Sequence, residues 1–187
     1  MGRTLVANKL LAGSACVKRH LGRPVVSCHM AAKKKQPLKL QIDMVPATSW
    51  GKNLRKSIPK SRWNKIKEQA HDRNGRKCHI CGSTEKLHCH EMWDFDDESK
   101  TQRLAGLGTV CNMCHHAMHM GRSLQLALTD QLDMNAVVDH FLKVNQCTQK
   151  TFEQHQREAA ALFNERSNHE WRIDFGEYET VVQEYAS

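Results

Sequence analysis

Two pairs of cysteines constrain the fold of this chain more than any other feature of its sequence. Cys78 and Cys81 form the first pair, Cys111 and Cys114 form the second, and 29 residues lie between the pairs. Two intervening residues allow a tight turn to present both sulfurs to one ion, and zinc favours four thiolates in tetrahedral geometry. The spacing therefore predicts a structural zinc site, with room between the pairs for a hairpin and a loop.

The sequence between the pairs predicts this hairpin. A strand is predicted around His88 and His90, and residues 104–110 can return as the second strand. Because successive side chains of a strand point to opposite faces, the two histidines share one face. Cys89 and Glu91 share the other face.

A helix is predicted to follow the second strand directly. It starts near Cys111 and places His115 and His119 on one face, because these histidines are four residues apart. Two histidines at this spacing on a helix are suited to binding one divalent metal ion. A strand histidine next to a helix with the pattern His-x-x-x-His therefore predicts a compact active site.

A basic helix is predicted before the first cysteine pair, over about residues 60–73. Trp63 and Ile66 recur at helical spacing and are expected to face the core. Pro59 suits the start of a helix, and Asn74 followed by glycine suits its end. The helix would lead directly into the cysteine cluster.

Positive charge is concentrated in two parts of the chain. The net charge is +8, and residues 1–42 hold nine Lys/Arg and no acidic residue, which leaves a nearly neutral remainder. Within that remainder, residues 52–77 hold ten Lys/Arg against two acidic residues. This stretch could form a phosphate track into the metal sites, or a solvated lysine face. The candidate nucleic-acid contacts are Arg62, Lys65, Arg73, Arg76, Lys77 and His116.

Further elements are predicted on both sides of this core. Hydrophobic residues alternate with polar ones before Pro46, and two amphipathic stripes follow Gly121, which we interpret as a break. The elements expected are a strand or extended segment at 38–45, a loop at 47–57, helices at 133–143 and 151–166 capped by Asp133 and Thr151, and a strand at 171–175.

These elements predict an α+β fold with three regions. Residues 1–37 form a basic arm that we expect to be disordered, with an organellar presequence or a nucleic-acid-binding arm as alternatives. Residues 38–124 form the metal-binding domain, and residues 125–187 form a helical extension packed on it. No apolar run is long enough for a transmembrane helix. The cysteine spacing favours metal binding in a reducing compartment such as the cytoplasm over disulfides.

The motifs around the cysteines resemble those of the HNH endonucleases, also called the ββα-metal or His-Me finger family, in particular the members stapled by a zinc site of four cysteines. The resemblance covers about 42 of the 187 residues. It rests on Cys78-x-x-Cys81, His88-Cys89-His90-Glu91 and Val110-Cys111-Asn112-Met113-Cys114-His115. It implies a small ββα-metal core that hydrolyses DNA phosphodiester bonds with one divalent metal ion.

The resemblance also implies roles for individual residues. His90 would take a proton from water, with the adjacent Glu91 as a second catalytic candidate. His115 and His119 would bind a divalent ion such as Mg²⁺, Mn²⁺, Ni²⁺ or Zn²⁺. The remaining metal ligand stays open among His88, Cys89 and Glu91.

One departure from the family pattern concerns an asparagine between the strand and the helix. Residues 92–110 contain none, and Asp94, Asp96 or Asp97 could substitute by orienting His90, or could form a solvated acidic loop. Because of this departure, a second hypothesis stays open. In this hypothesis the protein is a non-catalytic zinc module, built on a degenerate HNH scaffold, that binds nucleic acid or protein. A third hypothesis is an RNA- or ribosome-associated zinc protein that binds through its basic arm. The endonuclease is the leading hypothesis, with DNA favoured over RNA.

Overall fold

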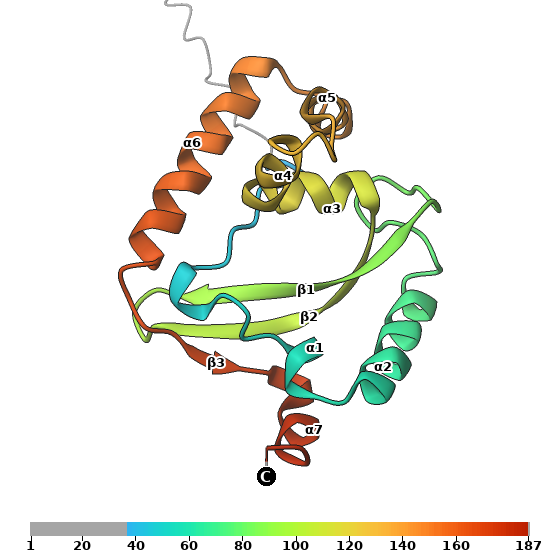
Figure 1. Ribbon diagram of the computed structural model, residues 1–187, viewed down its shortest axis with the longest axis vertical. Helices are drawn as coiled ribbons and strands as arrows, with labels where there is room; N and C mark the ends of the chain where they lie inside the picture. Colours follow the sequence, from blue (N-terminus) through green and yellow to red (C-terminus); the bar gives the residue numbers. More distant parts are fainter. Residues whose placement is uncertain (1–36, 187) are drawn as a thin grey trace, which may run out of the picture. The chain divides into compact units, whose positions relative to one another are not determined.

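The computed structural model describes residues 37–186, so the arm predicted at 1–37 lies, apart from Pro37, outside the described residues. Residues 37–187 form one compact unit. Its described part has an α+β fold, the class that the sequence predicts, with a three-stranded sheet and seven α-helices (Figure 1). The helices are α1 (Leu54–Ser57), α2 (Lys60–Arg73), α3 (Asn112–Met118), α4 (Met120–Ala127), α5 (Met134–Asn145), α6 (Gln149–Arg166) and α7 (Glu179–Gln183). The strands are β1 (Leu87–Asp96), β2 (Thr101–Cys111) and β3 (Arg172–Asp174).

The centre of the unit is the long hairpin of β1 and β2, which pair antiparallel, with β3 parallel to β2 at the other edge. The hairpin was predicted, but both strands are longer than expected. Asp94 and Asp96 lie within β1 and not in a loop, and β2 begins at Thr101. Gly108 faces His90 across the ladder. A Cβ there would lie 2.6 Å from the His79 ring, so only glycine lets the first cysteine turn approach β2 this closely.

Two hydrophobic clusters lie on the hairpin. One packs α3, α5 and α6 against both cysteine pairs and is centred on Val110, Val137 and Phe141. The other packs α1 and α2 against β2 and includes Trp63 and Ile66. Both of these side chains are buried, which confirms the face predicted for the basic helix. In Figure 1, α3, α4 and α5 lie above the hairpin, and α1 and α2 lie below it.

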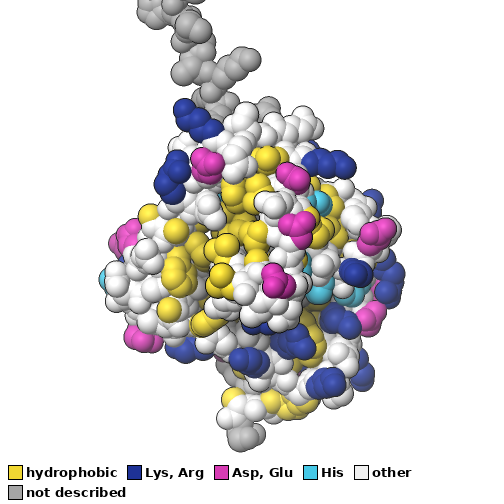
Figure 2. Space-filling model, turned by 45° about the horizontal axis from the view of Figure 1, so that its top comes forward, with side chains coloured by type: hydrophobic (Ala, Val, Ile, Leu, Met, Phe, Trp, Pro, Cys, Tyr) yellow, Lys and Arg dark blue, Asp and Glu magenta, His cyan; other side chains and the backbone are white. Residues whose placement is uncertain are grey.

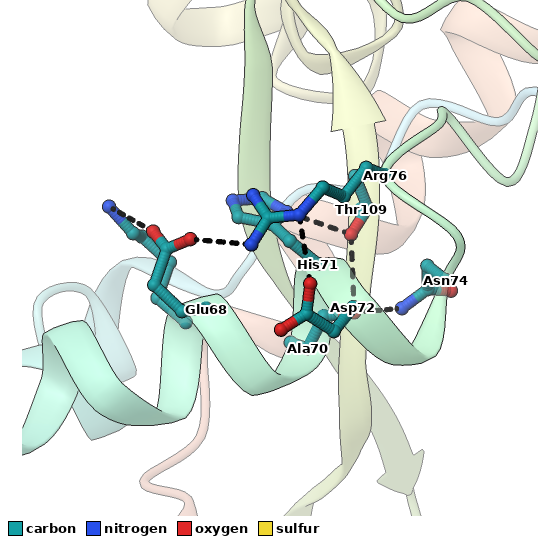
Figure 3. A network of polar contacts seen from close by, with 8 residues as sticks. Glu68, Ala70, His71, Asp72, Asn74, Arg76 and Thr109 are labelled. Carbon is teal, nitrogen blue, oxygen red and sulfur yellow. Dashed lines mark hydrogen bonds and ion pairs between the residues drawn. The ribbon is translucent and has the colours of Figure 1, made fainter.

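Helix α2 is fastened to β2 by a buried polar contact. His71 Nδ1 lies 2.9 Å from the Thr109 hydroxyl, and Thr109 in turn donates to the Ala70 carbonyl (Figure 3). Burial lowers the pKa of His71, which keeps the ring neutral in this position. The end of α2 is also as predicted, because Asn74 follows the last helical residue and Gly75 has a φ of +63°.

The segment before Pro46 is extended, with Leu40 and Ile42 buried, but it pairs with no strand of the described structure. Its backbone instead bonds to side chains of distant helices. Asn145 accepts from the Leu40 N–H and donates to the Leu40 carbonyl, and His155 Nε2 accepts from the Ile42 N–H. The alternating pattern therefore marks a segment that buries one face but is not part of the sheet. Of the two forms predicted for residues 38–45, a strand or an extended segment, the structure has the extended segment.

Other boundaries differ from the predictions for local reasons. The loop expected at 47–57 contains a 3-10 turn and α1, which Asn53 caps. The break expected at Gly121 lies at His119, so Gly121 is inside α4, an element that the sequence did not predict. Helix α5 is capped by Asp133 as predicted, whereas α6 begins earlier because Thr148 caps it in place of Thr151.

No helix among residues 37–186 combines the length and the apolar character needed to cross a bilayer.

Candidate metal centres

The four paired cysteines converge on one point. Their sulfurs all lie within 4.8 Å of one another, and Cys81 and Cys111 are 3.5 Å apart. Four sulfurs arranged tetrahedrally around zinc at about 2.3 Å would be about 3.8 Å apart. The predicted convergence is thus present, and the cluster could hold a metal ion such as zinc.

The chain positions these sulfurs with matching turns in the two pairs. In each pair the backbone N–H of the second cysteine points at the sulfur of the first, at 3.5 Å for both Cys81 to Cys78 and Cys114 to Cys111. The first pair lies in the loop between α2 and β1, and the second begins α3, where Cys111 is the N-cap residue. The cluster therefore joins the loop after α2 to the start of α3.

The electrostatics of the cluster also fit a cation. Burial opposes ionisation of Cys78, but backbone N–H groups outweigh it and lower the pKa to about 7. Burial raises the pKa of Cys81 to about 11 and raises the pKa of Cys114 further, with the neighbouring thiols adding to the shift. Thiolates crowded in this way need a positive ion to be stable.

A second cluster, the histidine cluster, consists of His90, His115 and His119. One ring nitrogen from each lies within 4.8 Å of the others. The ring of His119 lies 4.9 Å from that of His90 and 4.6 Å from that of His115, measured between centroids. The three rings could hold one divalent ion, and imidazole is a common ligand for such metals.

Two elements bring these rings together. His90 comes from β1, and its side chain points to the side of the sheet on which α3 lies. His115 is on α3, and His119 follows its last residue, with the His119 N–H still bonded to the His115 carbonyl at 3.0 Å. The predicted spacing of four residues therefore places both rings on one side of the helix, even though α3 ends before His119.

His115 and His119 are in the protonation state that a metal requires. Burial is the main reason that the pKa of His115 is lowered to about 3 and that of His119 to about 4, and the neighbouring histidines lower both further. Both rings are therefore neutral at pH 7, and a neutral ring can donate a lone pair to a metal.

An unpartnered ring nitrogen of His90 gives an independent test of whether the histidine cluster fits a metal ion. His90 is only 4% exposed, and its Nε2 has no hydrogen-bond partner in the described structure. Asp43 Oδ2 lies 3.7 Å from it, which is too far for a hydrogen bond. A buried ring nitrogen without a partner is uncommon. Its position inside a group of three histidines fits a metal ligand.

Asp43 is a site residue that the sequence did not reveal. It lies in the extended segment, and its backbone N–H bonds to the Met118 carbonyl at 2.9 Å, which holds it beside the end of α3. Two of the three acidic residues suggested for orienting His90 have other partners, because Asp96 bonds to Ser99 and Asp97 pairs with Arg166. Asp43 occupies the place beside His90 instead.

The other candidates on β1 lie next to the histidine cluster or on the opposite face. His88 stacks on His115 at 4.7 Å, and its Nε2 lies 3.0 Å from Asn112 Oδ1, so it is adjacent to the cluster but already has a partner. Cys89 packs with the α2 side of the sheet, and burial raises its pKa to about 11. Glu91 accepts hydrogen bonds from the backbone N–H groups of Leu54 and Arg55.

A cavity of about 550 Å³ opens at the histidine cluster. It runs along β1, the edge strand of the sheet, so residues from both faces of β1 reach it. Its lining includes the three histidines and also Asp43, Glu91, Gln102, Trp63, Trp93, Phe163, Lys52, Arg55 and Arg122. The site therefore combines possible metal ligands, a carboxylate, aromatic rings and cations.

Three of the six residues predicted to contact nucleic acid have partners within the protein. Arg73 donates to the Tyr178 hydroxyl, and Arg76 pairs with both Glu68 and Asp72 (Figure 3). His116 Nδ1 lies 3.2 Å from the Ser123 hydroxyl. Lys65 and Lys77 are exposed on the surface, and Arg62 is half-buried. None of these six residues lines the cavity, whose cations come from α1, α4 and the loop before α1.

Comparisons of the chain with models of protein families, with curated proteins and with solved structures found no match.

Proposed function

We propose that the protein is a metal-dependent endonuclease of the HNH type that hydrolyses phosphodiester bonds in nucleic acid, with DNA favoured over RNA. The observation that carries this proposal is the histidine cluster of His90, His115 and His119, whose ring nitrogens meet within 4.8 Å at the wall of a cavity. A hairpin followed by a helix supplies these rings, as the family resemblance implies. A divalent ion bound there would place positive charge at the scissile phosphate and at the departing oxygen.

We assign His90 to metal binding together with His115 and His119. This assignment differs from the role of general base that the resemblance implies for His90, and the unpartnered Nε2 within the histidine cluster supports it. His88 is then a neighbour that packs on His115 and orients it through stacking.

Glu91 is the group best placed to accept a proton from the attacking water. It follows His90 directly on β1 and lines the same cavity. Each carboxylate oxygen accepts one backbone N–H, from Leu54 or Arg55, which fixes the carboxylate while leaving lone pairs free. A fixed carboxylate in the cavity that the three histidines also line fits a general base.

Phosphate binding is assigned to the cations of the cavity. Arg55 and Arg122 both line it, one from α1 and one from α4, and both side chains are exposed. Figure 2 shows hydrophobic side chains gathered in the middle of one face of the molecule, with Lys and Arg side chains below them. Cations beside an apolar cavity would position a nucleic-acid backbone at the histidines.

The second candidate is a zinc module that binds nucleic acid or protein without catalysis. It is favoured by the short connection between β1 and β2, residues 97–100, which has no asparagine of the kind that the family uses. The cysteine cluster would serve this function equally well, because it stabilises the fold in either case.

The nuclease proposal is tested by cleavage of supercoiled plasmid and of a labelled oligonucleotide. The zinc-loaded protein is incubated with Mg²⁺, Mn²⁺, Ni²⁺ or Zn²⁺ at neutral pH. We expect cleavage with at least one ion and a decrease in rate of about 100-fold or more in His119→Ala, since a metal ligand is lost. His169→Ala changes an exposed histidine outside the cavity and should cleave like the wild type. Equal cleavage by wild type and His119→Ala, or none with any ion, would contradict the proposal.

A further inference from the structure

A glutamine without a hydrogen-bond partner lies in the wall of the cavity that contains the histidine cluster. Gln102 on β2 is 0% exposed, and neither its Nε2 donor nor its Oε1 acceptor has a partner in the described residues. It lines the cavity. Buried polar groups almost always have partners, because loss of water is otherwise uncompensated. Gln102 therefore holds an unpaired donor group and an unpaired acceptor in the wall of the cavity, and a molecule bound deep against this wall would satisfy both.

We propose that the cavity binds an unpaired nucleobase of the substrate, with the amide of Gln102 bonding to the edge of that base. The inference rests on the proposed nuclease function and specifies its substrate as one with an unpaired nucleotide. A glutamine amide forms two hydrogen bonds with a base edge that has a neighbouring acceptor and donor, as adenine has at N7 and N6. The Watson–Crick edge of any unpaired base also places a donor beside an acceptor, so the amide can bind a base of any kind.

The size and lining of the cavity fit one flat ring. A volume of about 550 Å³ lies within the range of pockets for small molecules, roughly 300–1,000 Å³, so it suits a nucleotide and excludes a double helix. Trp63, Trp93 and Phe163 contribute aromatic surface to the wall. Bases stack readily on such rings, and they can do so here only after leaving a helix.

A further aromatic ring lies at the cavity but remains open to solvent. Trp50 is 71% exposed, although it lines the cavity, and it is followed by Gly51 with a φ of +86°. An exposed tryptophan next to an apolar cavity is suited to stacking on a base at the entrance. Trp50 and Gln102 therefore mark two points that one single strand could contact.

The site for the base is separate from the metal ligands along the strand. His90 is paired with Gly108, and Gln102 is paired with Phe95, which is five positions further along β1. At about 3.3 Å per residue, the two backbone positions are about 17 Å apart. The bound base therefore belongs to a nucleotide that flanks the one being cleaved.

The test is a binding measurement in which no cleavage is needed. Full-length, zinc-loaded protein without added divalent ion is titrated into a labelled single-stranded oligonucleotide and into its duplex, followed by fluorescence anisotropy. We expect the single strand to bind about tenfold or more tightly than the duplex. Gln102→Met should weaken single-strand binding about tenfold without affecting duplex binding, because two hydrogen bonds to the base are lost. Gln125→Met, at an exposed glutamine of the same cavity, should bind like the wild type.

The outcomes separate this inference from the nuclease proposal. Wild-type affinity of Gln102→Met for the single strand would overturn the inference and would mean that water satisfies the amide. If Gln102→Met does not fold, Trp50→Ala replaces it, because this exposed ring can be removed without disturbing the core; unchanged single-strand affinity in that variant would also overturn the inference. Binding that depends on Gln102, without cleavage under any condition, would support the base site while contradicting the nuclease function.

Discussion

Replacing Cys114 by serine is expected to abolish zinc binding by the cysteine cluster and to unfold most of the domain. Cys114 is fully buried between α3 and α5, and its sulfur lies 3.2 Å from His140 Nε2 as well as among the other three sulfurs. Structural zinc sites supply roughly 10 kcal/mol or more of folding free energy, while whole domains are stable by only about 5–15 kcal/mol. Loss of one ligand can therefore remove most of the free energy of unfolding.

This result is measured as zinc per chain by mass spectrometry and as the free energy of unfolding in urea. Cys147→Ser is the matched control, since Cys147 is a half-buried thiol outside the cysteine cluster. It should retain zinc and lose no more than about 1 kcal/mol. A Cys114→Ser protein that kept its zinc and the stability of the Cys147→Ser protein would show that the cysteine cluster is not a metal site.

Replacing Glu91 by glutamine is expected to lower the rate of cleavage by about 10²- to 10⁴-fold, the usual contribution of a general base. Glutamine has nearly the same shape but cannot accept a proton. Its Oε1 can still accept one of the two N–H groups of α1, so the loss of stability should stay near the roughly 1 kcal/mol typical of a helix cap. The ion on the histidine cluster should remain bound, because Glu91 is not one of its ligands.

The comparison for Glu91→Gln is Glu98→Gln, which changes an exposed carboxylate in the turn between β1 and β2. It should cleave at the wild-type rate. If Glu91→Gln retained full activity with its ion in place, Glu91 would act only as a cap for α1, and His90 would again be the best candidate for the base.

The parts of the fold set by local sequence were predictable. Helix α2 was placed because Trp63 and Ile66 mark a buried stripe and Asn74 with Gly75 ends it. The alternation along β1 correctly separated His90 from Glu91, and the four-residue spacing brought His115 to His119. These features depend on periods of two and 3.6 residues and on cap residues, all of which are visible in a short window.

The parts set by contacts between distant residues were not predictable in this way. Asp43 lies beside His90 because contacts with Met118, Asn145 and His155 fasten the extended segment to α3, α5 and α6. Asp97 is drawn away from the site by Arg166, which lies 69 residues further along the chain. Helix α1 has a single turn, which is too short to show a hydrophobic period.

Gln102 gave no signal in the sequence, where it is one polar residue beside the hairpin turn. Its burial follows from the length of the hairpin, because residues 101–103 also pair with β3 from the far end of the chain. The segment before α1 and Phe163 of α6 line the same cavity as Gln102. A glutamine becomes informative only when its burial and its lack of partners are both known.

The most direct test of the histidine cluster is a count of the bound divalent ions in single-histidine variants. Cobalt is added by equilibrium dialysis to protein whose cysteine cluster already holds zinc, and bound cobalt is measured by its visible absorption and by mass spectrometry. We predict one exchangeable cobalt per wild-type chain, the same in His88→Ala, and a loss of binding in His90→Ala and His119→Ala because each removes one of three ring ligands. An equal cobalt content in all four proteins, or no cobalt in the wild type, would contradict a metal site on His90, His115 and His119.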